Sequence, residues 1–572
     1  MSLVIVISVG AVLTIFVTIM MSYGLAAYGK SASDQRWNAA MAAAYAGIEE
    51  YQSRLANEPA YLRYGNPASA FSAGSVVQLP PDDNPAFGLG ETGTWATIPG
   101  SNGDSEFRYE VDNSEYATTG NLRIRSTGRV GDATRTIVAD LRQQGFIDFL
   151  YFTDLEMQDT NLSGAATSCE RYHWLNPRPT SCSNIAFGNR DVLNGPVHSN
   201  DTIRACGTEF NGTVTTANPS TPRVLARTSA GAGCGSQGNP RFTLPGYPAF
   251  APQLELPQTN TQMRREVRSD LPIDVPRPGC LYTGPTKITL HSNGEITVYS
   301  PWTRATRIAG QPATTGSAPS ACGDISRITT GSGHRFTPPE NNLIYVQNVP
   351  SVNTDPNFWR SDQRPAGLNC TGAGNNSVEG GGSVVGNGIG YPIRFEQLPR
   401  LQANSYQCRV GDVFVEGSMS GKITIAAENF IYITGNIAYR DSQEDILGLV
   451  GNNSIFVWNP VNSSGQALLS DVNRRIDAAM LSVERTIQVQ NFYRGGDRGD
   501  LIVNGAMGQK FRGIVRQGTA TVANGGYDKE YNYDPRLRYT APPKFLSPVT
   551  TTYGINVWIE TERAFNADGS AR

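Results

Sequence analysis

Few residues in this 572-residue chain have the chemistry of a catalyst. Its only four histidines are His173, His198, His291 and His334. In the segment "VHSND", His198, Ser199 and Asp201 are the residue types of a hydrolase triad. Residues this close in sequence rarely converge as a triad, and no nucleophile-elbow motif accompanies them. Side chains that satisfy turn backbone groups explain the segment better. We therefore predict no catalytic site and no cofactor.

Two acidic segments are candidate ligand sites. These are "YRDSQED" (439–445) and "GGDRGD" (495–500), and grouped Asp and Arg also occur in the sites of solenoid polysaccharide lyases and hydrolases. Asp497 and Asp500 are weak calcium candidates because oxygen-rich turns bind this ion, but no regular calcium repeat surrounds them. Arg498-Gly499-Asp500 matches a cell-attachment tripeptide that chance explains. The favoured interpretation of both segments is a solvated loop.

Aromatic residues alternate with Lys and Arg near the end of the chain. They are Tyr527, Tyr531, Tyr533 and Tyr539. Such a mixture suits stacking on sugars or bases, and it predicts a ligand-stacking surface. The alternative, which we favour, is that these tyrosines cap the end of a repeat structure together with Pro542 and Pro543.

The eight cysteines all lie between Cys169 and Cys408. An even number in one region predicts disulfides and an extracytoplasmic body. Pairing by locality joins Cys169 to Cys182, Cys206 to Cys234, Cys280 to Cys322 and Cys370 to Cys408, although eight cysteines allow 105 connectivities. No CxxC pair or zinc spacing is present. A net charge of −3 also gives no reason to expect nucleic-acid binding.

Short strand–turn units recur in residues 146–572. "VFVEG" (413–417) is followed 18 residues later by "IYITG" (431–435), and "NGPV" (194–197) recurs 17 residues later as "NGTV" (211–214). Each unit at such an interval buries its apolar face on the next. We expect a large β-rich head that is a parallel β-solenoid, with a β-sandwich as the alternative.

The first 56 residues predict one long helix. Residues 1–29 carry no charge, and Leu3 to Met21 is long enough to span a bilayer. In residues 30–56 an apolar stripe follows the helical period; its members are Trp37, Met41, Ala44, Ile48, Tyr51 and Leu55. This segment has an apolar half (1–29) and an amphipathic half (30–56).

Residues 57–145 predict a small antiparallel sheet. Three segments alternate apolar and polar residues with period two between Gly- or Asn-containing turns. The residues expected to face the amphipathic half are Tyr109, Val111, Leu122, Ile124, Ile137 and Val138. Packing the helix on this sheet buries both stripes, so the predicted fold class is α+β.

Residues 1–145 resemble processed type IV pilins of bacteria, most of all PilX-like minor pilins. The resemblance rests on Met1-Ser2-Leu3-Val4, the uncharged helix, "DQRWNAAMAAAYAGIEEYQSRL" (34–55) and "STGRVGDATRTI" (126–137). It implies that a prepilin peptidase removes a basic leader ahead of Met1, that Met1 is methylated, and that subunits pack helix to helix. Met1, Ser2, Leu3 and Ile5 are then the processing and assembly residues.

Position 5 departs from the family pattern. Most pilins carry Glu there, and its carboxylate pairs with the N-terminal ammonium of a neighbouring subunit. Here the residue is Ile5. A lone carboxylate in hydrocarbon costs a few kcal/mol, whereas Ile5 needs no partner. The departure resembles the tip pseudopilin of type II secretion systems and predicts a minor, tip-proximal subunit.

Three functions follow from these expectations. The favoured one is a minor pilin on a cell-surface filament, which displays its head for adhesion or assembly initiation and sits in the cytoplasmic membrane beforehand. The others are a membrane-anchored glycan-active enzyme on a solenoid and a pseudopilin of a secretion system. Predicted partners are other pilin subunits, prepilin peptidase, the cytoplasmic membrane and a surface or glycan ligand.

Overall fold

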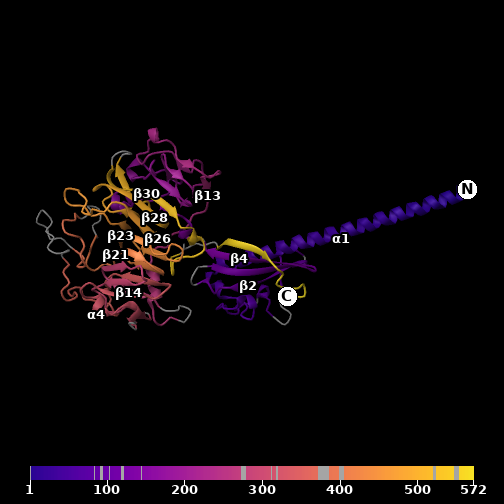
Figure 1. Ribbon diagram of the computed structural model, residues 1–572, viewed down its shortest axis with the longest axis horizontal. Helices are drawn as coiled ribbons and strands as arrows, with labels where there is room; N and C mark the ends of the chain where they lie inside the picture. The colour runs from indigo at the N-terminus through magenta and orange to yellow at the C-terminus, as the bar shows by residue number, and fades with distance from the viewer. Residues whose placement is uncertain are drawn as a thin grey trace. The chain divides into compact units, whose positions relative to one another are not determined.

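The chain forms two compact units. The computed structural model describes residues 2–82, 84–89, 94–101, 103–116, 121–143, 145–271, 278–310, 312–316, 320–370, 386–397, 405–518, 523–546 and 553–572. Unit 1 comprises Met1–Gln143 and Thr552–Arg572, and unit 2 comprises Gln144–Thr551 (Figure 1). The fold class is α+β, as predicted: a long helix and a small sheet in unit 1, and a large sheet-rich body in unit 2.

Unit 1 is built on a single helix, α1 (Ser2–Asn57). Its buried residues recur every three or four positions in the second half: Ala40, Ala43, Ala44, Gly47, Ile48, Tyr51 and Leu55. The predicted stripe is therefore right from Ala44 onward. At its start, Trp37 is 37% exposed and lies under the guanidinium groups of Arg135 and Arg563.

The helix packs on a five-stranded antiparallel sheet. The strands, in spatial order, are β1 (Ala96–Thr97), β2 (Ser105–Asp112), β3 (Asn121–Val130), β4 (Ala133–Gln143) and β31 (Tyr553–Thr561). Five of the six residues expected to face the helix are buried in its core cluster. Val138 is not among them, because it follows Ile137 in the strand and points to the opposite face; Ala139 takes that place.

The last strand of unit 1 comes from the end of the chain. β31 pairs with β4 from Tyr553↔Gln143 to Thr561↔Thr136. The expectation that the head runs from 146 to 572 is therefore corrected: unit 2 is inserted between two neighbouring strands of unit 1. The reason is that β4 would otherwise be an open sheet edge, and β31 satisfies its backbone groups.

Most of the described strands of unit 2 belong to three ladders of parallel strands. Ladder A consists, in spatial order, of β14 (Cys280–Thr283), β20 (Asn342–Gln347), β22 (Lys422–Ala427), β24 (Ile446–Gly451), β26 (Arg474–Ser482), β28 (Gly496–Phe511), β5 (Tyr151–Leu155), β7 (Val197–Ser199), β10 (Val214–Thr216) and β13 (Ala249–Phe250). Ladder B consists of β15 (Thr286–Leu290), β21 (Val413–Met419), β23 (Ile431–Tyr439), β25 (Ile455–Val457) and β27 (Ile487–Val489). Ladder C uses parts of β21, β23, β26 and β28, then β30 (Ala523–Tyr533), β6 (Val192–Asn194), β9 (Glu209–Phe210) and β12 (Arg241–Phe242).

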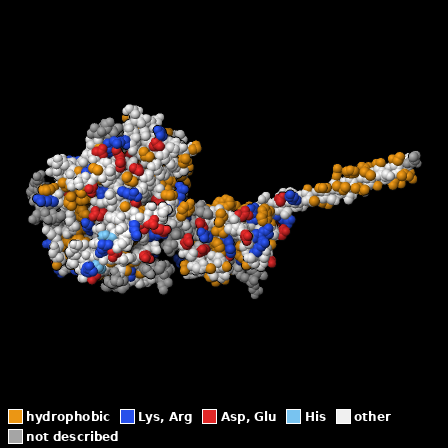
Figure 2. All heavy atoms as spheres, viewed as in Figure 1, with side chains coloured by type: hydrophobic (Ala, Val, Ile, Leu, Met, Phe, Trp, Pro, Cys, Tyr) orange, Lys and Arg blue, Asp and Glu red, His pale blue; other side chains and the backbone are white. Residues whose placement is uncertain are grey.

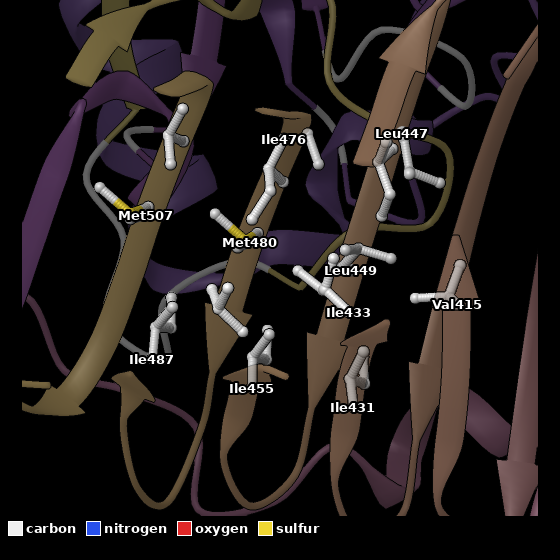
Figure 3. Packing of buried hydrophobic residues seen from close by; sticks show 14 of the residues in the cluster. Val415, Ile431, Ile433, Leu447, Leu449, Ile455, Ile476, Met480, Ile487 and Met507 are labelled. Carbon is white, nitrogen blue, oxygen red and sulfur yellow. The ribbon is translucent and has the colours of Figure 1, made fainter. Parts of the chain in front are cut away.

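Parallel ladders on successive faces are the arrangement of a β-solenoid, so the sandwich alternative is wrong for unit 2. The core of the coils is mainly aliphatic: Figure 3 shows Val415, Ile431, Leu447, Ile455 and Met480 among the side chains that fill it. Alternate residues of each strand point inward, which is why the recurring units of the sequence place apolar residues two positions apart.

Short elements flank the coils. β8 (Ile203–Arg204) pairs with β11 (Val224–Leu225), and β17 (Ile308–Ala309) with β18 (Thr314–Thr315). β16 (Ile296–Tyr299) and β19 (His334–Phe336) extend β15 antiparallel, and β29 (Arg516–Gly518) pairs with β30. The helices α3 (Thr160–Ser163) and α4 (Ile325–Ile328) are single turns.

The coils are not stacked in sequence order. The chain first builds one end of the stack from β5 to β13 and then the other end from β14 to β20. Residues 413–533 fill the middle until β28 reaches β5 and β30 reaches β6; we call this junction the seam. Between the two ends, residues 254–267 lie on ladder A, where the Asn260 side chain donates to the carbonyls of Ala427 and Val450.

Candidate functional site

The apolar half of α1 is exposed along its length. Leu3 is 72% exposed, Phe16 58% and Leu25 72%, and Figure 2 shows hydrophobic side chains along this half. Buried apolar side chains stabilise a protein by about 1.5–3 kcal/mol each, so leaving a whole row in water is strongly unfavourable. The helix is long and apolar enough to cross a membrane. This surface therefore requires an apolar environment, which is either lipid or other protein.

The residues expected to act in processing lie at the start of this helix. Ser2, Leu3 and Ile5 are within α1, and Ile5 is 62% exposed. Met1 lies outside the described residues. Because the side chain of Ile5 is apolar, position 5 brings no charge into the apolar surface.

The amphipathic half is docked on the sheet through close backbone contact. A Cβ placed on Gly128 of β3 would lie 2.1 Å from the carbonyl oxygen of Ala40 and 2.3 Å from the nitrogen of Ala44. On the helix side, a Cβ on Gly47 would lie 2.3 Å from the hydroxyl of Ser126. Glycine at these two positions lets helix and sheet approach until Tyr51 and Tyr109 pack edge to face, with ring centroids 5.1 Å apart.

The triad-like residues of the head hold structure instead. His198 and Ser199 are neighbours on β7, so their side chains leave opposite faces. Asp201 forms a buried ion pair with Arg178 at 2.5 Å and accepts from the backbone N–H of His173. His198 bonds Thr215 at 2.8 Å, and burial lowers its pKa to about 4. Within the segment, Ser199 Oγ accepts from the backbone N–H of Asp201 and Asp201 Oδ1 accepts from that of Thr202.

The four histidines do not gather at one site. His173 accepts from the backbone N–H of Arg178, His291 bonds Thr297 at 2.8 Å, and His334 accepts from the backbone N–H of Asp324. Burial is the main cause that lowers the pKa of each of these three rings.

The two calcium candidates lie in strand β28, on either side of an irregularity in its pairing with β30. One oxygen of Asp497 accepts from the N–H of Gly499, and the N–H of Asp500 donates to Asn473. Arg498, the first residue of the attachment-type tripeptide, is 4% exposed. Among the described residues, no three His, Cys, Asp or Glu side chains are grouped to hold a metal ion, so the calcium prediction has no support at these two residues.

The tyrosine-rich segment neither caps the solenoid nor forms one surface. β30 lies inside ladder C, between β28 and β6, and Tyr527 and Tyr531 are 0% and 3% exposed. Tyr533 donates to the carbonyl oxygen of Ile147. Tyr539 alone of the four is more than half exposed, so the predicted stacking surface is corrected. The physical reason is that period-two alternation in a strand turns Tyr527 and Tyr531 into the core.

Four disulfides join neighbours in sequence order. They are Cys169–Cys182, Cys206–Cys234, Cys280–Cys322 and Cys370–Cys408. Each joins cysteines 13 to 42 positions apart in the chain, which limits the conformations of the unfolded chain.

Sequence reasoning missed the charged groups at the seam. Arg512 pairs with Glu156 at 2.7 Å, and both side chains are at most 1% exposed. Lys529 donates to Asp191 at 2.7 Å. Arg512 also lies 3.4 Å from the ring centroid of Phe187. No local signal marks these residues, because the partners lie more than 300 positions apart in the chain.

A cavity of about 550 Å³ lies beside the seam. Four of its lining residues, Gln488, Asn491, Phe492 and Tyr493, come from the segment "QVQNFY" (488–493), which starts within β27. Lys529 of β30 lines the cavity as well. This run of amide and aromatic side chains is the sequence signal that would have identified the cavity.

Comparisons with known proteins give no family for the chain. No protein-family model matches the sequence, and none of the curated proteins matches it. Among solved structures, the competence-associated pilin ComZ from Thermus thermophilus aligns with 92% of this chain and 97% of its own, at 12% identity and a TM-score of 0.26. A superposition this loose carries no argument, so the functional interpretation depends on the geometry above.

Proposed function

We propose that this chain is a subunit of a type IV pilus-like surface filament. The observation that carries the proposal is α1 itself: one unbroken helix whose first half is apolar and exposed while its second half is docked on the sheet of unit 1. The apolar half lies in the cytoplasmic membrane before assembly and against the helices of other subunits afterwards. Prepilin peptidase and other pilin subunits are then its partners.

Within that class we propose a minor, tip-proximal pilin of the PilX-like kind. Ile5 supports this position, because a subunit without a carboxylate there offers no partner to a neighbouring N-terminal ammonium. The large disulfide-containing unit 2 supports display outside the cell, for adhesion or for the start of assembly. The role is structural rather than catalytic.

The test compares sheared surface filaments from the native host carrying one of two matched variants. V9D places a carboxylate on the apolar half, where Val9 is 53% exposed, and N38D places one on the exposed face of the second half. We expect V9D to be lost from the sheared fraction, since a charge in the filament core is costly, and N38D to be retained.

Mass spectrometry of the N-terminal peptide completes the test. A methylated Met1 in the sheared fraction supports processing and assembly. A chain found only in the membrane with a leader still attached would contradict the proposal. Immunogold labelling of unit 2 then tests position: label along whole fibres, rather than at their ends, contradicts the tip placement.

A further inference from the structure

The cavity beside the seam lies where ladder B ends. β27 is the last strand of that ladder, and beyond it the chain segments 158–163, 183–186 and 513–518 form the remaining walls. Its volume of about 550 Å³ is within the range of small-ligand sites, which is about 300–1,000 Å³. Gly513 packs so closely on β27 that a Cβ there would lie 1.7 Å from the carbonyl oxygen of Ile487. The cavity wall is therefore built into the coil and not left by a loose loop.

Gln488 lines the cavity at the end of an outward row of ladder B. In that row Phe414, Tyr432, Phe456 and Gln488 are in register on successive strands, and the first three rings stack. Gln488 is 4% exposed, and its Oε1 has no hydrogen-bond partner among the described residues. An unsatisfied buried acceptor is unfavourable. Because a terminal amide rotates in a broad well, this oxygen is able to accept from a donor placed in the cavity.

The two cationic side chains in the lining already have acidic partners. Lys529 donates to Asp191 at 2.7 Å, and Arg516 lies 3.1 Å from Asp528. Neither Asp191 nor Asp528 is a lining residue of the cavity. The other polar side chains of the lining are amides and hydroxyls, so every charged side chain of the lining has a partner of opposite sign.

Two aromatic rings form one wall. Phe492 and Tyr493 pack edge to face, with centroids 5.3 Å apart and an interplanar angle of 76°. An aromatic face beside amides and hydroxyls combines an apolar surface with hydrogen-bond donors and acceptors. A sugar ring has the same combination: C–H groups on its faces and hydroxyls at its rim.

We propose that this cavity binds a neutral saccharide, with its ring on the Phe492–Tyr493 wall and a hydroxyl donating to Gln488 Oε1. The proposal deepens the adhesive role under the proposed function by naming its ligand class. Failure of the two is distinguishable, because binding by purified full-length protein requires no filament.

The test titrates the full-length protein in a detergent without sugar headgroups against neutral disaccharides: lactose, maltose, cellobiose and diacetylchitobiose. Saturation-transfer NMR detects the weak binding expected of one small pocket. Q488M removes the acceptor at nearly constant volume, and Y493A removes half of the aromatic wall. We expect each variant to weaken binding about tenfold. Y539A is the matched control, because Tyr539 is an exposed tyrosine of the same unit outside this cavity, and it should bind like the native protein.

Three outcomes overturn the proposal: none of the four disaccharides binds, binding is unchanged in both Q488M and Y493A, or only acidic sugars bind. If Y493A lowers the melting temperature of unit 2, the binding measured with Q488M alone tests the proposal. This variant removes an unsatisfied polar atom and is expected to fold at least as stably as the native protein.

Discussion

The docking of α1 on the sheet depends on Gly128, and the change G128A tests it. The new Cβ would meet three backbone atoms of the helix: Ala40 O at 2.1 Å, Ala44 N at 2.3 Å and Ala43 C at 2.8 Å. Backbone atoms cannot rotate away as a side chain does, so the helix would have to move by roughly 1 Å to restore ordinary contact. Overpacking of this kind costs about 1–3 kcal/mol.

This loss of stability predicts a lower melting temperature for unit 1. For a unit of this size, each kcal/mol lowers the melting temperature by about 2–4 °C, so we expect unit 1 to lose roughly 2–12 °C. Scanning calorimetry of the full-length protein in detergent measures this shift, with the transition of unit 2 as an internal reference because Gly128 and α1 both belong to unit 1.

The matched control is G554A on β31 of the same sheet. A Cβ there would meet only Arg142 O, at 3.8 Å, and the residue has no positive φ. We expect no loss of stability and a gain of up to about 1 kcal/mol from the reduced entropy of the unfolded chain. If unit 1 melts at the same temperature in G128A and in G554A, the helix is not held against β3 as described and the reasoning is refuted.

Three further predictions concern other parts of the chain. Burial raises the pKa of Glu396 and of Asp412 to about 7 in the folded state, so above the ordinary carboxyl pKa the folded protein binds more protons than the unfolded one. Stability should therefore fall by about 3 kcal/mol for each of the two groups as pH rises from about 4.5 to 7, and urea melts of E396Q should show a smaller pH slope than those of the native protein. Replacing Cys206 and Cys234 together by Ser opens a loop with a sequence separation of 28 and should cost unit 2 about 3–4 kcal/mol, whereas an unchanged urea midpoint would contradict a stabilising role for this disulfide. Deleting residues 553–572 exposes the edge of β4 and should lower or abolish the calorimetric transition of unit 1 while that of unit 2 stays in place; equal loss of both would show that the units do not fold separately.

Most elements of this fold were predictable because their signals are local. The helical period of residues 44–55 and the alternation in 105–143 depend on neighbours two to four positions apart, and both appear where expected. The spacing of 17 and 18 residues predicted stacked coils for the same reason, since each coil repeats one short pattern. Errors arose at single residues. Val138 was assigned to the wrong face, and Tyr527 and Tyr531 to an end cap or a stacking surface, because alternation alone does not say which face is buried.

The sequence by itself determined the exposed apolar helix, the disulfide-containing β-rich head and the absence of a charge at position 5. Only the tertiary structure decided which strands meet. The pairing of β31 with β4, the seam of β28 with β5, and the ion pair of Arg512 with Glu156 each join residues more than 300 positions apart. Such contacts depend on which open edges remain after the local elements have formed, and no pattern within one segment carries that information. The saccharide cavity arises at this seam, so its residues become a site only when the chain has closed on itself.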